Sequence, residues 1–374
     1  MRFPEFSGEW EKCKLEDCVD FLDGLRKPIK SEDRKCEMGL YPYYGASGII
    51  DYIDEYIFDG DYILLSEDGA NILDRNYRIA FLAKGKIWVN NHAHVLLPHT
   101  NIDIDFLSEA LERLNYAVYN TGTTMPKLNQ EVCRTIGLYI PPIKEQNKIG
   151  ALLSLLNERI ATQNKIIEDL KLLKSAIIDY AVNTLDIDTV KFSSLYKTAR
   201  EGRTPSTSSV DFYKNGQIPF VKIDDLKQKY LTENKDFITE LGLQKSSAWL
   251  VPTNSILFSN GATIGEISIT TYPVCTKQGI LGIVPKSHVD VEFLYYFMSS
   301  TYFRKEVCRI MTEGTMKTAY LKDINNIPCP IPTKETQQEI AKMPSLLNSK
   351  IELEQDILDT LNKQKQYLLR QMFI

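Results

Sequence analysis

Two long stretches of the chain carry apolar residues at alternating spacings of four and three. The first spans residues 149–181 and the second spans residues 340–372, and each position in the second lies 191 residues after its counterpart. Because such spacing keeps one apolar stripe facing a partner helix, it predicts two paired coiled-coil helices of about 33 residues, roughly 50 Å long. We name this stripe the seam; its apolar members are Ile149, Leu153, Leu156, Ile160, Ile167, Leu170, Ile177, Leu347, Ile351, Leu358, Leu361 and Leu368.

Shorter segments repeat at nearly the same offset. Residues 63–70 (ILLSEDGA) return as 256–262 (ILFSNGA), 122–125 (GTTM) as 314–316 (GTM), and 140–145 (IPPIKE) as 331–335 (IPTKE). The chain is therefore a diverged duplication. One such helix alone is equally well explained as generic packing, but two register-matched copies favour two globular modules held apart by a helix pair.

Each module has the pattern of a mixed α/β domain. In the first we predict strands at 62–66, 79–82, 86–89 and 94–97 and a helix at 104–114. In the second we predict strands at 256–259, 266–270 and 280–284 and helices at 291–299 and 303–311. Residues 45–48 and 204–209 have loop composition. The predicted boundaries are 1–143 for the first module, 144–183 for the central helix, 184–332 for the second module and 333–374 for the C-terminal helix.

Composition narrows the class of protein. The 374 residues are 43% hydrophobic and 25% charged, which is ordinary for a globular protein. We expect a cytoplasmic protein without membrane contact, since the sequence has neither a long apolar run nor a signal-like start. Seven cysteines without a C-x-x-C pair argue against a disulfide framework and a zinc site.

The inventory of catalytic motifs is empty. No phosphate-binding glycine loop, no H-E-x-x-H segment and no Asn-Pro-Pro-aromatic segment occurs. His92 and His94 would share one face of a strand and could suit a metal, but no acid or cysteine lies nearby in sequence. We therefore favour two hydrogen-bonded histidines and predict no metal site.

Charge alone does not indicate nucleic-acid binding, since the net charge is −5 and residues 1–143 hold 15 Lys and Arg against 23 Asp and Glu. Basic loops nevertheless occupy corresponding places in the two copies, around 26–35 and 197–203. Solvated charged loops are the alternative explanation for each residue. The candidate DNA contacts are Arg26, Lys27, Lys30, Tyr43, Tyr44, Ser47, Asn90, Asn91, His92, Thr123, Lys127, Arg200, Arg203, Thr204, Lys222, Asn260, Thr276, Lys277, Gln278, Thr315 and Lys317.

Several segments together resemble the specificity subunit of type I restriction-modification systems. They are RFPEF at 2–6 with Trp10, YPYYGASGII at 41–50, NNHAHVL at 90–96 and PPIKEQNKI at 141–149. The resemblance covers essentially the whole chain. The second copy departs from it, with PTKETQ at 332–337 and no Gly-Ala-Ser-Gly loop, so its DNA preference should differ.

The resemblance implies two α/β target recognition domains related by a pseudo-two-fold, separated by two antiparallel helices, each reading half of a bipartite site in double-stranded DNA. It implies that the helices dock methyltransferase subunits and that restriction and translocase subunits complete the complex. S-adenosylmethionine, ATP and magnesium would bind those partners, so this chain needs no cofactor and is no enzyme itself. Two alternatives stay open: a duplicated coiled-coil scaffold that binds only protein, which the acidic first module favours, and a methyltransferase or nuclease, which the missing motifs disfavour.

Overall fold

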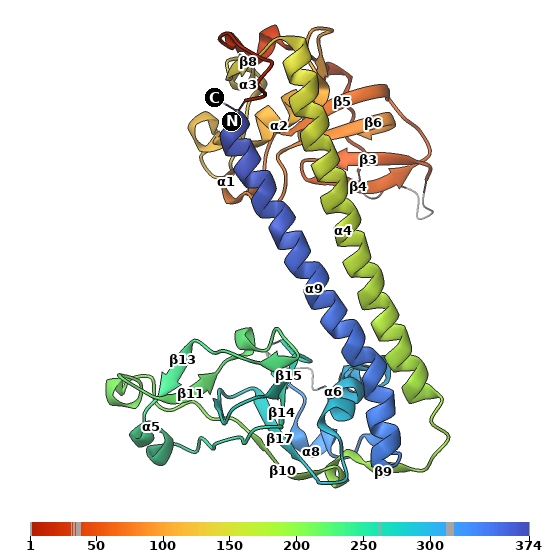
Figure 1. Cartoon of the computed structure of the whole chain (residues 1–374), viewed down its shortest axis with the longest axis vertical. Coiled ribbons are helices and arrows are strands. Elements are labelled where there is room, and N and C mark those ends of the chain that lie inside the picture. Colours follow the sequence, from red (N-terminus) through yellow and green to blue (C-terminus); the bar gives the residue numbers. More distant parts are fainter. Residues whose placement is uncertain are drawn as a thin grey trace. The chain divides into compact units, whose positions relative to one another are not determined.

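The chain folds into two compact units in a computed structural model that describes residues 2–30, 32, 34, 39–261, 263–311 and 318–373. Unit 1 comprises Met1–Asn164 and Asp356–Ile374, and unit 2 comprises Lys165–Gln355. Each unit therefore combines one module with parts of both long helices, α4 (Ile143–Asn183) and α9 (Lys334–Met372) (Figure 1). None of the described helices has the length and apolar character of a membrane span.

Unit 1 is built around a six-stranded sheet of order β2-β7-β5-β6-β3-β4. Its neighbours are antiparallel except β3 and β6, which run parallel. A separate antiparallel pair, β1 with β8, joins the beginning of the module to its end. The strands are β1 (Glu11–Lys14), β2 (Val19–Phe21), β3 (Tyr41–Gly45), β4 (Gly48–Ile53), β5 (Phe58–Ser66), β6 (Ala80–Val89), β7 (Ala93–Pro98) and β8 (Gly137–Ile140).

Helices cover one face of this sheet. They are α1 (Asn71–Asp74), α2 (Ile104–Glu112) and α3 (Gln130–Arg134). Helix α2 begins at the N-cap Asp103, whose carboxylate accepts a hydrogen bond from the Phe106 amide at 2.8 Å. Its apolar side, including Phe106 and Leu107, joins Ile63 and Leu65 of β5 in the main core of the unit.

Unit 2 distributes its strands over a five-stranded sheet of order β10-β17-β14-β15-β12, a three-stranded sheet of order β13-β11-β16 and the pair β18-β9. The strands are β9 (Thr189–Lys191), β10 (Tyr196–Glu201), β11 (Ile218–Val221), β12 (Tyr230–Leu231), β13 (Asp236–Ile238), β14 (Ile256–Ser259), β15 (Ile267–Thr270), β16 (Cys275–Thr276), β17 (Ile280–Pro285) and β18 (Pro328–Pro330). The helices are α5 (Glu240–Lys245), α6 (Val291–Ser299), α7 (Thr301–Ile310) and α8 (Leu321–Ile324).

The mixed α/β prediction and the long helices are confirmed. The predicted strands correspond to β5, β6, β7, β14, β15 and β17, whereas the other strands of both units were not predicted. The predicted strands at 79–82 and 86–89 belong to one continuous strand, β6. Residues 83–85 between them also pair with β5, with Gly85 opposite Gly60. The loop at 45–48 is the turn of a hairpin, β3 with β4, which the pattern analysis did not predict.

The two long helices run antiparallel within each unit. In unit 1 the start of α4, at Ile149 and Leu153, packs with the end of α9 at Leu369 and Met372. In unit 2 the end of α4 packs in the same core as the start of α9 at Ala341. All twelve seam residues are buried or half-buried, as the four-three spacing predicted.

Near the C-terminal ends of the two long helices, the most deeply buried positions lie one residue after the predicted seam positions. Ile178 and Val182 are buried rather than Ile177, and Leu369 is more deeply buried than Leu368. The reason is helical geometry: a straight helix of 3.6 residues per turn drifts by about 20° per heptad from a 3.5-residue repeat, which is nearly one residue over four heptads.

Matching polar contacts confirm the duplication. Gln146 Oε1 accepts from the Asp103 amide at 2.9 Å, and its Nε2 donates to the Pro141 carbonyl at 2.8 Å. Gln337 repeats both contacts in unit 2, with the amide of Asp290 at 2.7 Å and the carbonyl of Pro332 at 2.8 Å. Each buried glutamine therefore locks the beginning of a long helix to the beginning of the helix that covers its sheet.

We predict that Gln146→Ala lowers the free energy of unfolding by about 1–3 kcal/mol, because it leaves a buried amide and a carbonyl without partners. Gln364→Ala, an exposed substitution on α9, is the matched control and should change stability by less than about 0.5 kcal/mol. Chemical denaturation of the full chain measures both. Equal midpoints for the two variants would contradict the proposed clamp.

Candidate nucleic-acid interface

Four loops of unit 1 converge where β5 ends and β7 begins. The loop after β2 joins the end of β6 through a hydrogen bond from the Lys27 amide to the Val89 carbonyl at 3.3 Å. The Glu67 amide donates to the His92 carbonyl at 2.9 Å, and the Leu128 amide donates to the Glu67 carbonyl at 2.7 Å. We name these segments, residues 23–27, 67–68, 90–92 and 121–128, the unit 1 loop cluster.

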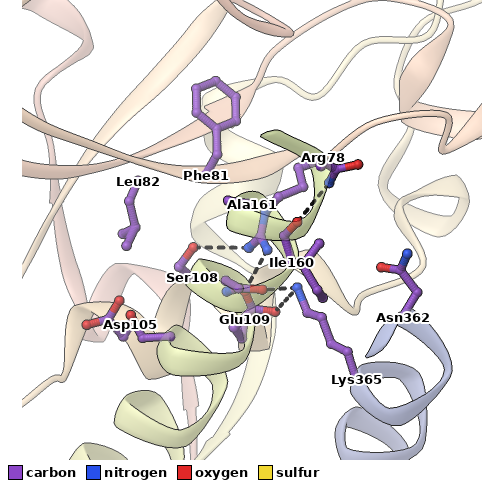
Figure 2. A pocket seen from close by; sticks show the side chains of 13 residues that line it. Arg78, Phe81, Leu82, Asp105, Ser108, Glu109, Ile160, Ala161, Asn362 and Lys365 are labelled. Carbon is purple, nitrogen blue, oxygen red and sulfur yellow. Dashed lines mark hydrogen bonds and ion pairs between the residues drawn. The ribbon is translucent and has the colours of Figure 1, made fainter. Parts of the chain in front are cut away.

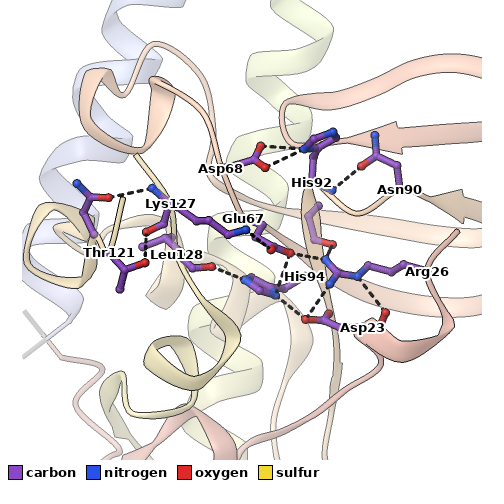
Figure 3. A network of polar contacts seen from close by, with 12 residues as sticks. Asp23, Arg26, Glu67, Asp68, Asn90, His92, His94, Thr121, Lys127 and Leu128 are labelled. Atoms are coloured by element: carbon purple, nitrogen blue, oxygen red, sulfur yellow. Dashed lines mark hydrogen bonds and ion pairs between the residues drawn. The ribbon is translucent and has the colours of Figure 1, made fainter. Parts of the chain in front are cut away.

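A buried ionic network holds this cluster together, as Figure 3 shows. His94 on β7 contacts Asp23 Oδ2 through Nδ1 at 2.6 Å and the Leu128 carbonyl through Nε2 at 2.8 Å. Arg26 binds Glu67 Oε2 at 2.7 Å and lies 3.4 Å from Asp23 Oδ2. One histidine thus connects the loop that carries Arg26 to the loop that precedes Leu128.

His94 is held as an imidazolium. Burial, the largest single cause, disfavours the charged form. The hydrogen bond to Asp23, the contacts with Cys133 and the charge of Asp23 together outweigh this cost and raise the pKa of His94 to about 10. The same pairing keeps the pKa of Asp23 low despite its burial. Both ring nitrogens then act as donors, which suits their carboxylate and carbonyl partners.

Asp23, Glu67 and His94 lie close enough to hold a metal, with ligand atoms within 4.8 Å of one another. Asp23 and Glu67 lie far from His94 in the sequence but close to it in the fold. The expectation that no acid lies near the two histidines is therefore wrong for the folded chain. The residues nevertheless do not fit a metal, since Arg26 neutralises both acids and neither nitrogen of His94 keeps a free lone pair. In the structure both histidines are hydrogen-bonded, His92 to Asp68 and His94 to Asp23.

Polar groups around this network reach the surface. Lys127 is exposed with its Nζ 3.3 Å from Glu67 Oε1, and His92 is exposed with its Nδ1 2.8 Å from Asp68 Oδ2. The hairpin turn with the exposed Ser47 is attached here, because Ser66 Oγ donates to the Ala46 carbonyl at 2.5 Å. Other exposed candidates are Lys27, Asn91 and Thr123 in the cluster and Lys30 beyond it.

Unit 2 repeats the backbone arrangement with different side chains. The Asn260 amide donates to the Gly279 carbonyl at 3.0 Å, and the Ala319 amide donates to the Asn260 carbonyl at 2.9 Å. These are the counterparts of the hydrogen bonds made by Glu67 and Leu128. We name residues 200–204, 260–261, 276–279 and 318–319 the unit 2 loop cluster.

The unit 2 loop cluster gathers most of the second set of candidates. Arg203 and Lys277 are exposed, and the Gln278 amide lies 3.5 Å from Thr204 Oγ1. Arg200 lies over the ring of Trp249 at 5.9 Å from its centroid. Lys222, half-buried after β11, pairs with Asp236 at 2.8 Å.

The structure corrects the expectation that all candidates are available to DNA. Five side chains are buried: Tyr43, Tyr44, Asn90, Asn260 and Thr276. Their side chains serve the fold instead. Tyr43 Oη accepts from the Ile29 amide, Tyr44 stacks on Phe81, Asn90 accepts from the His92 amide, Asn260 donates to the Ala319 carbonyl, and Thr276 packs against Gly202. Thr315 and Lys317 lie outside the described residues.

The acidic partners and Trp249 are absent from the candidates that the sequence indicated. Asp23, Glu67 and Asp68 orient the cations and histidines of unit 1, and the Trp249 ring supports Arg200. A signal was present in the repeat, since Glu67-Asp68 in the first copy corresponds to Asn260-Gly261 in the second. A charge difference between otherwise matching segments points to a place where the copies differ in function.

Comparison with known proteins gives consistent matches. Residues 7–172 and 185–363 match the family described as Type I restriction modification DNA specificity domain. The chain is 24% identical over 405 residues to the specificity subunit of the type I restriction enzyme MjaVIII of Methanocaldococcus jannaschii, covering 99% of this chain and 92% of that protein. It is 35% identical over 148 residues to a Haemophilus influenzae protein assigned as a type I restriction enzyme specificity subunit, covering 40% of this chain and 37% of that protein.

A solved structure is similar over the full length. The S subunit of a type I restriction-modification system from M. genitalium aligns with a TM-score of 0.66 at 17% identity, covering 100% of this chain and 99% of that chain. At this identity the similarity shows a common fold.

We predict that stability falls as pH rises through the titration of His94. A folded-state pKa of about 10 against an unfolded value of about 6.5 means that this contribution is complete below pH 6.5 and is lost toward pH 10. The free energy of unfolding of the wild type should therefore decrease more between pH 7 and 10 than that of His94→Gln. Parallel pH profiles for the two proteins would contradict the assigned imidazolium.

Proposed function

This chain belongs to the type I restriction-modification DNA specificity family, and we propose that its two loop clusters each read one half of a bipartite DNA site. The family is the non-catalytic specificity subunit of these systems. The matches favour DNA readout over a scaffold that binds only protein. In this proposal the chain positions methyltransferase and restriction subunits that carry out the chemistry.

One observation carries the proposal: the same backbone arrangement presents different polar groups in the two units. Where unit 1 has the exposed His92 and Lys127, unit 2 has Gly279 and Thr318 at the corresponding hydrogen bond and bridge. Base edges are distinguished by their donors and acceptors, so a changed set of side chains on a fixed support reads a different sequence. Two dissimilar half-sites follow.

In this proposal the exposed cations make one kind of DNA contact, and the exposed amides and hydroxyls make another. Phosphate contacts position a protein on the duplex, whereas contacts to base edges specify the sequence. Arg203, Lys277 and Lys127 supply the first kind, and Gln278, Asn91 and Thr123 are placed for the second. Within the cluster Asp23 and Glu67 are paired with Arg26 and His94, so these two acids add no unbalanced negative charge there.

We predict that Gln278→Ala in the reconstituted complex changes the base preference of the second half-site alone, whereas Arg203→Ala lowers methylation of all sequences alike. Loss of one base contact should cost about 1–3 kcal/mol at one base position, while loss of a phosphate contact should weaken all sequences alike. Methylation across substrates varied one base pair at a time measures both effects. Lys245→Ala, exposed on α5 of the same unit, is the control, and a changed base preference at the first half-site in either variant would refute the assignment.

The long helices offer a surface for the partner subunits. Leu155 and Leu346 are 65% and 60% exposed, and Ile166 and Ile357 are 39% and 41% exposed. Each pair is displaced by 191 residues, so the duplication carries the same exposed apolar positions on both helices. Exposed apolar positions that recur in this way mark a protein interface. Further members are Leu172, Leu173, Tyr180, Met343, Leu353 and Tyr367.

We predict that Leu155→Glu with Leu346→Glu abolishes co-purification of a co-expressed methyltransferase subunit, since both changes place a charge in an apolar interface. The folded chain should keep its thermal unfolding midpoint, because both side chains are exposed. Gln364→Glu on α9 adds the same charge at a polar exposed position and should bind the methyltransferase normally. Retained binding by the double variant would exclude this surface as the docking site.

A further inference from the structure

A cleft at the end of α2 in unit 1 collects an unusual number of cations. Its volume is about 570 Å³, which lies within the range of ligand pockets. Five cationic side chains and one carboxylate line it, although residues 1–143 as a whole are acidic. The charged lining residues are Arg75, Arg78, Glu112, Arg113, Lys365 and Arg370.

Part of this charge is already neutralised. Arg75 pairs with Glu112 Oε1 at 3.2 Å, while Arg78 and Lys365 share the buried Glu109 at 2.6 and 3.2 Å (Figure 2). Glu109 is inaccessible at the base of this group, with Asn157 donating to it at 2.8 Å. Arg78 and Lys365 are therefore held in place by Glu109, which does not reach a ligand, and Arg75 is held by Glu112, which lines the cleft.

Two arginines of the cleft have no acidic partner among the described residues. Arg113 lies over the Phe373 ring, 5.1 Å from its centroid, and burial lowers the pKa of its guanidinium. Arg370 projects from the last turn of α9 and is exposed. Amides of Asn76, Asn362 and Gln366 complete the polar lining. The arrangement offers planar donors on the walls and excess positive charge.

Unit 2 shows that this concentration is not a property of the fold. Helix α6 of unit 2 begins 187 residues after α2 of unit 1, so Arg113 corresponds to Ser300. The long helices repeat at an offset of 191 residues, so Arg370 corresponds to Asp179. There the Asp179 carboxylate accepts from the Thr301 amide at 2.7 Å, and Ser300 caps α7. The start of α7 thus occupies the place that remains a cationic cleft in unit 1.

We propose that this cleft binds a phosphate group through Arg113 and Arg370. Guanidinium groups match phosphate oxygens with paired hydrogen bonds, and an anion would balance the two unpaired charges. The phosphate can belong to a free polyphosphate or to the DNA backbone, and the chemistry of recognition is the same. The inference concerns a site outside both loop clusters and does not depend on base readout.

The test is calorimetric titration of the full chain with inorganic pyrophosphate. We expect one site in the wild type and at least about tenfold weaker binding in Arg113→Gln/Arg370→Gln, since each lost charge-assisted contact is worth that much. Arg159→Gln, an exposed arginine of unit 1 on α4, is the matched control and should bind normally. Thermal unfolding verifies that each variant is folded.

A second variant keeps the test valid if the double substitution destabilises the chain. Asn362→Glu adds a carboxylate to the cleft, leaves every arginine in place and should also weaken pyrophosphate binding at least about tenfold. No binding by the wild type, or equal binding by the wild type and both variants, would overturn the proposal.

Duplex affinity then distinguishes the two sources of phosphate. If the ligand is backbone phosphate, pyrophosphate competes with duplexes of any sequence, and the double variant has a salt slope shallower by about 0.9 per phosphate contact. If the ligand is a free polyphosphate, pyrophosphate binding is lost in the variant while duplex affinity and its salt slope stay unchanged. Either result supports phosphate binding in the cleft. Base readout by the loop clusters is tested separately by the substitutions at Gln278 and Arg203.

Discussion

Burial of both long helices in the cores of the units is the interaction on which the rest of the structure depends. Unit 1 completes its core with Ile149 and Leu153 from α4 and with Met372 from α9. Unit 2 does so with Ile178 and Val182. Burial of apolar surface stabilises each contact by about 25 cal/mol per Å². The helices are therefore parts of the modules, and the loops that each module presents rest on a rigid support.

Polar contacts give this packing its direction. Gln146 and Gln337 are buried, and a buried amide must find partners of defined geometry, whereas apolar side chains tolerate several arrangements. Because Gln146 and Gln337 make the same two hydrogen bonds, this position is glutamine in both copies, whereas the residue before it differs. Glu145 pairs with Arg2 at 2.6 Å near the chain's beginning, and the second copy has Thr336 at that place.

The two copies retain a common backbone and differ in the groups attached to it. In unit 1, Asp23 and Glu67 surround the His94 imidazolium, whereas the corresponding strand position in unit 2 is Leu281. Two of the acids of the first module, Asp23 and Glu67, thus act as internal partners for cations. From the net charge, Asp23 and Glu67 would be expected to repel DNA. Their positions instead make them part of the support for exposed donors.

Sequence alone determined the duplication, the long helices, the interior strands β5, β6, β7, β14, β15 and β17 and the family, because these depend on periodicity and local pattern. It placed Lys127, Arg203 and Lys277 among the candidates. Tertiary structure decided which candidates are accessible: Tyr43 is buried beside the loop residues Ile29 and Arg34, and Asn90 is buried beside the hairpin at Gly45. It also decided that Asp23 meets His94 across 71 residues. Such contacts arise from chain topology, and hydrophobic or charged spacing along the sequence carries no record of them.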